Sequence, residues 1–236
     1  MAQGCTGLLP RDDKGCARAG EVAVVCVATI AAAWAVRCHA QAIWWATPAI
    51  LLVAGIVPFL ARRQSPPAVL RVETLRQDLW VVLCTIAAVL PLTCLTIGLM
   101  ARAGVSLPWP SARPLNYPAW VVYQFLYVAV AEEVFFRGYL LSNAMRWFAR
   151  NRTIPQAGSP TVRRSDSQTV RQWLAIGLSA ACFAVAHAVV QGQAAGLLTF
   201  LPGLVMGWVF VRTGTLLAPI LFHGLANVVW QLAVGR

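Results

Sequence analysis

Long apolar runs separated by short polar stretches dominate the pattern of the chain. A helix needs roughly 20 mainly apolar residues to cross a hydrocarbon core of about 30 Å. The pattern therefore predicts an all-α fold, a polytopic transmembrane helix bundle of about seven or eight helices. The apolar runs cover residues 22–36, 42–61, 79–100, 117–145, 172–190, 194–211 and 214–234. The first run is short, whereas the fourth exceeds one crossing and predicts one long helix that extends out of the membrane.

The composition favours the same class of protein. Hydrophobic residues make up 59% of the 236 residues and charged residues 11%, and the mean hydropathy is +0.67. A soluble domain carries about 25% charged residues, so this chain lacks the polar side chains to cover a water-facing surface. Soluble, disordered and fibrous classes are excluded. We expect a polar N-terminal segment, 1–20, followed by a single transmembrane domain, 21–236.

The basic residues predict an orientation. The net charge of +11 comes from 18 Arg, one Lys and eight acidic residues. With a cytoplasmic N-terminus and seven crossings, fourteen basic residues fall on the cytoplasmic side and four on the far side, with Arg137 inside the membrane. This is the bias of integral membrane proteins, and it gives the cytoplasmic face affinity for anionic lipid. No basic-aromatic motif accompanies the charge, so nucleic acid is not expected as a partner.

The fourth apolar run contains charges that lipid disfavours. Glu132-Glu133-Val134-Phe135-Phe136-Arg137 places Glu133 and Arg137 four residues apart, on one face of a helix, where they can form an ion pair. Glu132 points about 100° away and has no such partner in its own helix. Ionisable groups inside a membrane mark a functional site or an internal pair. We interpret Glu133 and Arg137 as the pair and Glu132 as the carboxylate available for chemistry.

Two further motifs carry polar groups in apolar helices. Phe183 lies one turn before His187 on the same helix face and can shield the imidazole. His223 and Asn227 share a face in the last run and can supply two donors to an oxyanion. Counted from the nearest cytoplasmic Arg, Glu132, His187 and Asn227 lie fourteen to sixteen positions into their helices. At 1.5 Å per residue this is roughly 21–24 Å, so we expect one shared polar site, with His223 a turn shallower.

Each of these groups also has a structural interpretation. An intramembrane His or Asn often forms a hydrogen bond between helices, and a Glu/Arg pair can simply hold a bundle together. Gly196, Gly203 and Gly207 indicate close helix packing. The seven cysteines contain no CxxC and no metal-ligand spacing. Only the common depth favours a functional site over separate structural roles.

The three ordered motifs EExxxR, FxxxH and HxxxN resemble those of the CPBP intramembrane proteases. This family includes type II CAAX prenyl endopeptidases of the Rce kind and bacteriocin-processing enzymes, also known as Abi proteins. The stretch from Leu216 to His223 resembles the lead-in to the last motif. The resemblance covers about 117–234, and no residue of the three motifs is missing.

The resemblance implies peptide-bond hydrolysis inside the membrane by a glutamate-activated water. It implies that Glu132 is the general base and that His187 helps to hold the water. His223 and Asn227 would form the oxyanion site, while Glu133 and Arg137 would brace the first motif. We expect no cofactor. Zinc held by Glu132, His187 and His223 is the alternative, because two imidazoles and a carboxylate form a known open zinc site.

The resemblance suggests prenylated CAAX tails as substrates, but the depth estimate places the site nearer the non-cytoplasmic side. We therefore expect a membrane-anchored or exported protein substrate, with a C-terminal sorting helix or a leader peptide, in a bacterial plasma membrane. Two alternatives stay open. A transporter or proton relay would use the buried Glu and His residues, and a non-catalytic immunity or scaffold protein would need none of them for chemistry.

Overall fold

The computed structural model describes residues 19–39, 45–103, 116–150 and 164–234. Within these ranges every regular element is a helix, which confirms the predicted all-α class. The elements outside the central helix are α1 (Ala19–His39), α2 (Ala46–Ala61), η3 (Val72–Thr74), α3 (Leu75–Arg102), α7 (Arg164–Gln191), η6 (Ala194–Thr199), α8 (Phe200–Thr213) and α9 (Leu217–Val234).

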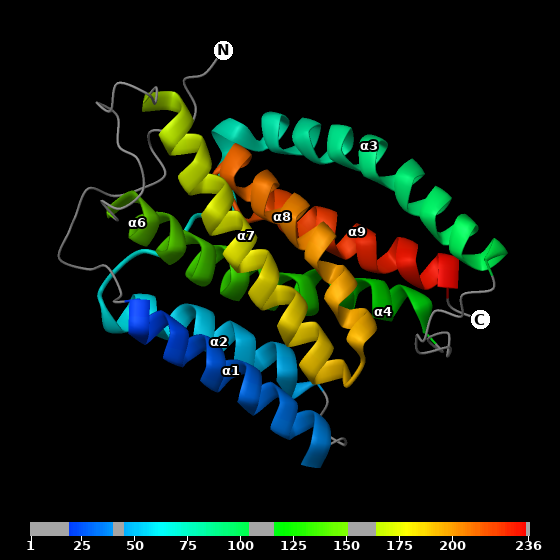
Figure 1. The fold of residues 1–236 in the computed structure, drawn as a ribbon, viewed down its shortest axis with the longest axis horizontal. Helices are drawn as coiled ribbons and strands as arrows, with labels where there is room; N and C mark the ends of the chain where they lie inside the picture. Colours follow the sequence, from blue (N-terminus) through cyan, green and yellow to red (C-terminus); the bar gives the residue numbers. More distant parts are fainter. Residues whose placement is uncertain (1–18, 40–44, 104–115, 151–163, 235–236) are drawn as a thin grey trace.

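The predicted long fourth helix is present and runs through the centre of the bundle (Figure 1). It extends over 34 residues, Tyr117–Arg150. Two π-helical stretches interrupt its α-helical geometry, and π turns occur frequently at functional sites. Its successive parts are α4 (Tyr117–Tyr123), η4 (Gln124–Ala129), α5 (Val130–Glu133), η5 (Val134–Leu141) and α6 (Ser142–Arg150).

Five helical stretches in the described part of the chain are long and apolar enough to cross a membrane. Two shorter apolar helices, Ala46–Ala61 and Leu217–Leu232, bring the total to the seven that the hydrophobic pattern predicts. The first helix is longer than its apolar run, because α1 covers 21 residues. The polar segment 1–18 lies outside the described residues, and so do residues 151–163 of the second polar connection.

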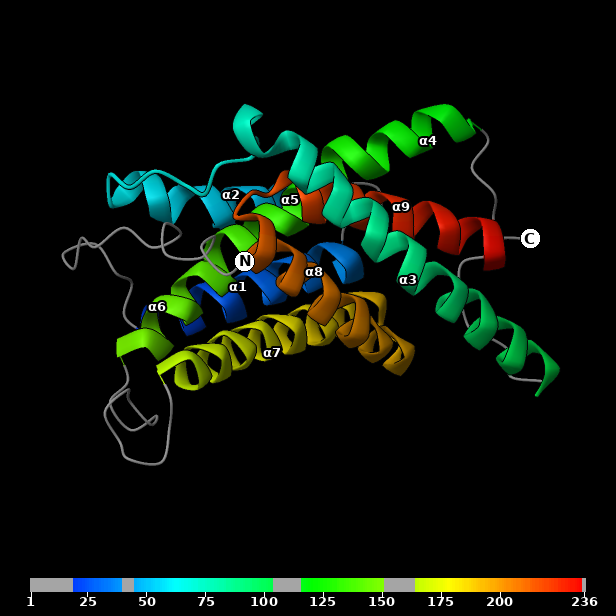
Figure 2. The same cartoon turned by 90° about the horizontal axis from the view of Figure 1, so that it is seen from above.

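The other helices surround the central one. The paired helices α1 and α2 lie along one side of it, while α7 and α8 pack against each other on another side (Figures 1 and 2). Helix α9 packs against η4, and α3 lies outside α9 and α8. Only 11% of the α3 span is buried inside the protein, so most of its surface is available to lipid.

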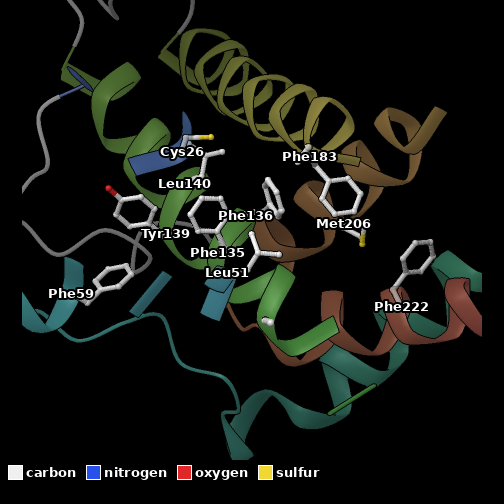
Figure 3. Close-up of a cluster of buried hydrophobic side chains, with 12 residues drawn as sticks. Cys26, Leu51, Phe59, Phe135, Phe136, Tyr139, Leu140, Phe183, Met206 and Phe222 are labelled. Atoms are coloured by element: carbon white, nitrogen blue, oxygen red, sulfur yellow. The ribbon is translucent and has the colours of Figure 1, made fainter. Parts of the chain in front are cut away.

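Aromatic side chains form the core around η5. The rings of Phe135 and Phe136 lie edge to face with centroids 5.0 Å apart, and Phe136 contacts Phe183 of α7 at the same separation (Figure 3). Helix α8 approaches α7 closely at two glycines, as the sequence predicts. A Cβ at Gly207 would lie 2.9 Å from Ile176 Cγ2, and one at Gly203 would lie 3.2 Å from Ala180 Cβ.

The start of α9 is fixed by the chain that precedes α3. Gly214 adopts a left-handed conformation (φ 74°) and ends α8. The amides of Leu216 and Leu217 then donate to the carbonyls of Ala68 and Val69, at 3.0 and 2.8 Å. These two bonds satisfy N–H groups that the first turn of a helix leaves without a partner. They place the start of the helix that carries His223.

Candidate active site

The predicted ion pair between Glu133 and Arg137 lies at the centre of the site. Arg137 Nη1 is 2.9 Å from Glu133 Oε1, and both side chains have no exposed surface. Arg137 Nη2 donates to the carbonyl oxygen of Gly203 at 3.1 Å, and its Cζ lies 4.7 Å from the Phe183 ring centroid. The central helix is thereby tied to both α7 and α8.

His223 binds the same carboxylate from α9. Its Nδ1 lies 2.8 Å from Glu133 Oε1. Since that oxygen belongs to a carboxylate paired with Arg137, it accepts the hydrogen bond and the Nδ1 atom donates. Neutral His223 then carries a lone pair on Nε2. This Nε2 atom lies 3.7 Å from Glu132 Oε2.

His187 has the corresponding arrangement on α7. Its Nδ1 lies 3.0 Å from the carbonyl oxygen of Phe183, which can only accept, so Nδ1 again carries the proton. Its Nε2 lies 3.8 Å from Glu132 Oε2. That carboxylate oxygen is buried and has no hydrogen-bond partner among the described residues. Three acceptor atoms, one from each of three helices, therefore face one another.

Phe183 covers both imidazoles, as its spacing from His187 predicts. Its ring centroid lies 4.3 Å from that of His187 and 5.8 Å from that of His223. Phe183 itself is 2% exposed. The site is partly open nonetheless, because the side chains of Glu132 and His187 are 13% and 20% exposed. An apolar wall around acceptors with this limited opening suits a small polar reactant such as water.

Asn227 lies at a second position along α9. Its Nδ2 donates to Gln124 Oε1 at 2.9 Å, eight residues before Glu132 on the central helix. The depth estimate placed Asn227 level with Glu132 and His223 a turn away, whereas in the structure His223 contacts Glu132. Counting from the nearest Arg does not measure depth here, because α7 begins at Arg164 and α9 at Leu217.

Gln124 was missed by the sequence reasoning. It is the only side-chain amide between Tyr117 and Ala131, a stretch that is otherwise apolar or aromatic. Polar side chains inside a membrane favour contacts with other polar groups, so this isolated amide was a usable signal.

The zinc alternative concerns the same three side chains, Glu132, His187 and His223. In the part of the chain that the structure describes, no three His, Cys, Asp or Glu side chains form a group that could hold a metal ion. The Nδ1 atoms of both imidazoles are bound to the carbonyl oxygen of Phe183 and the carboxylate of Glu133. Histidines that bind zinc through Nε2 make the same kind of bond from Nδ1, so these bonds do not distinguish the two alternatives. We derive no chemical step through a metal.

The fold and the site define an integral, multi-pass membrane protein with charged and imidazole groups buried between its helices. Residues 114–229 match the family of type II CAAX prenyl endopeptidase Rce1-like proteins. This match, over 116 of the 236 residues, supports the family that the three motifs predicted. No curated protein and no solved structure matches the chain. Members of this family are generally proteases, and the match supports a CAAX-protease-type membrane function at the level of the family.

Proposed function

We propose that this protein is an intramembrane endopeptidase that hydrolyses a peptide bond with water activated by Glu132. The observation that carries the proposal is the convergence of Glu132 Oε2 and the Nε2 atoms of His187 and His223. At 3.7 and 3.8 Å these atoms are too far apart for direct hydrogen bonds. A water between them would donate to two of the acceptors, and Glu132 would hold it beside a substrate carbonyl.

The reaction then proceeds by general-base catalysis. Glu132 takes one proton from the water, and the water oxygen bonds to the scissile carbonyl carbon. The C–N bond breaks, the proton passes to the departing nitrogen, and the products are a carboxylic acid and an amine. His187 keeps the water in place through its Nε2 lone pair.

The negative charge on the carbonyl oxygen needs donors. Asn227 donates one of its two Nδ2 hydrogens to Gln124 Oε1, and the second is available to donate to the oxyanion. His223 donates from Nε2 only while it holds the proton that Glu132 has taken from the water, since its Nδ1 proton is bound to Glu133. This same proton is the one that then passes to the departing nitrogen. Removing one oxyanion donor lowers kcat by about 10²–10³-fold in a well-studied protease, so both side chains are expected to matter.

We further propose that the substrate is a membrane-anchored or exported protein with a leader peptide or a C-terminal sorting helix. Glu132 lies near the middle of a 34-residue apolar helix, so the scissile bond must enter the membrane. Such a protein has an apolar segment next to the bond to be cut. A transmembrane helix must unwind locally before cleavage, because a helical peptide group is bonded within the helix.

The test is a processing experiment in cells. Membrane and exported proteins are compared by N-terminal and C-terminal peptide analysis in cells with wild-type protein, Glu132→Gln or His187→Ala at equal levels. Glu73→Gln is the matched control, because Glu73 lies exposed in η3, outside the site. We expect one precursor or a small set of precursors to accumulate in both site variants and not in wild type or the control.

Two outcomes would overturn the proposal. Unchanged protein patterns with full biological activity of Glu132→Gln would indicate an immunity or scaffold role. Unchanged patterns together with Glu132-dependent proton flux in liposomes would indicate a relay instead of a protease.

A further inference from the structure

Two polar contacts, one helical turn apart on α9, join that helix to the central one. In the first, His223 contacts Glu132 and Glu133. In the second, Asn227 Nδ2 donates to Gln124 Oε1 at 2.9 Å. His223 and Asn227 are four residues apart and share a face of α9. The mechanism proposed above uses both side chains of α9 but assigns nothing to Gln124.

The backbone brings Gln124 to this position. Gln124 is the first residue of η4, where π-helical hydrogen bonds replace the regular α-helical ones. Between the two polar contacts, Gly224 of α9 faces Phe125 of η4, and a Cβ on Gly224 would lie 2.5 Å from Phe125 Cδ1. The two helices therefore approach as closely as a glycine allows, directly beside the Gln124–Asn227 hydrogen bond.

The hydrogen bond selects one orientation of the Asn227 carboxamide. A carboxamide has a donor end and an acceptor end of nearly the same shape. With Nδ2 bound to Gln124 Oε1, the donor end of Asn227 is held as long as Gln124 keeps its own carboxamide in this orientation. If the group turned by 180°, Oδ1 would replace Nδ2, and an oxygen in that place would repel a developing oxyanion.

We infer that Gln124 is a positioning residue that keeps the donor end of Asn227 directed into the site. This inference rests on the proposed function, because it assigns Asn227 the oxyanion of peptide hydrolysis. The only property of Gln124 that it requires is the acceptor Oε1 at the end of the side chain. Glutamate keeps such an oxygen in the same place, whereas methionine keeps the length of the side chain and loses the acceptor.

The role predicts a change in kcat without a comparable change in KM. The oxyanion forms after substrate binding, so a misdirected Asn227 weakens only contacts of the transition state. We expect Gln124→Met to lower kcat about ten- to a hundredfold, with KM changed less than about threefold. We expect Gln124→Glu to retain most of the wild-type kcat.

The experiment measures cleavage in proteoliposomes of full-length variants. The probe is the precursor that accumulates in Glu132→Gln cells, purified and reconstituted with the enzyme. Gln124→Met and Gln124→Glu are compared with wild type, and Leu126→Met serves as a control because Leu126 is 70% exposed on the same helix. Gln124→Met is also combined with Asn227→Ala, and a thermal unfolding curve of each variant establishes that it is folded.

The double variant separates positioning from a general structural role. If Gln124 acts through Asn227, Gln124→Met has no further effect on kcat once Asn227 is alanine. Two results would overturn the inference and leave the proposed function intact, provided that the wild-type protein cleaves the precursor. The first is an equal loss of kcat in the Gln124→Met and Gln124→Glu variants. The second is a further loss of kcat when Gln124→Met is added to Asn227→Ala. A wild-type protein that cleaves no better than Glu132→Gln would instead overturn the proposed function.

Discussion

His223 Nδ1 and Arg137 Nη1 both donate to one carboxylate oxygen, Glu133 Oε1, at 2.8 and 2.9 Å. The ion pair within the first motif is thereby joined to the histidine of the last motif. Glu133 fixes which nitrogen of His223 carries the proton, and so determines that Nε2 faces Glu132. The two adjacent glutamates consequently have different roles. Glu132 presents an oxygen that has no hydrogen-bond partner among the described residues. Glu133 accepts hydrogen bonds from Arg137 and His223.

Neutralising these two glutamates should affect different properties. Breaking a buried ion pair by removing one partner costs about 3–5 kcal/mol, because the remaining charge stays buried. We therefore expect Glu133→Gln to lower the unfolding temperature in detergent clearly, since Arg137 is wholly buried. Glu132→Gln should leave the unfolding temperature nearly unchanged and abolish cleavage. Thermal unfolding and precursor cleavage of both variants test this. Equal stability losses in both would contradict the division of roles.

The sequence predicted the helices and the members of the site better than their mutual arrangement. Apolar runs reveal spans because a membrane requires them to be long, and the i, i+4 spacing correctly paired Glu133 with Arg137. The contact of His223 with Glu132, and that of Asn227 with Gln124, depend on how α9 crosses the central helix. That crossing is fixed by the π turns of η4, by Gly224 and by the bonds at the start of α9, which spacing alone does not reveal.

Gly224→Ala should impair activity by separating α9 from η4. The new methyl group would lie 2.5 Å from Phe125 Cδ1, closer than real atoms approach. We expect a reduction of cleavage of about tenfold or more, because a shift of 1 Å at catalytic groups can cost about 10²-fold. The control is Gly177→Ala in α7, where a Cβ would meet nothing within 4 Å. Restored cleavage in the Gly224→Ala, Phe125→Ala double variant would establish the steric cause, and full activity of Gly224→Ala alone would contradict it.

Chelation should leave cleavage unchanged. The proposed mechanism activates water with the carboxylate of Glu132 and needs no metal ion, and among the described residues no three His, Cys, Asp or Glu side chains form a metal-binding group. We expect purified protein dialysed against a zinc chelator to retain its cleavage rate and to contain less than stoichiometric metal by elemental analysis. Zinc that restores activity lost on chelation, with Glu132, His187 and His223 all needed for zinc binding, would establish the zinc alternative in place of the metal-free mechanism.

The charge distribution predicts which ends of the helices face the cytoplasm. With a cytoplasmic N-terminus, the end of α1 lies on the far side and the connection after α2 on the cytoplasmic side, because Arg62 and Arg63 flank it. Cys38, at the end of α1, is exposed, and so is Ser65 in that connection. In variants that keep one cysteine each, a membrane-impermeant maleimide added to intact cells should label Cys38 and not Ser65→Cys. Lysed cells provide the control, since both positions should react there. The reverse labelling pattern would contradict the predicted orientation and place the N-terminus on the far side of the membrane.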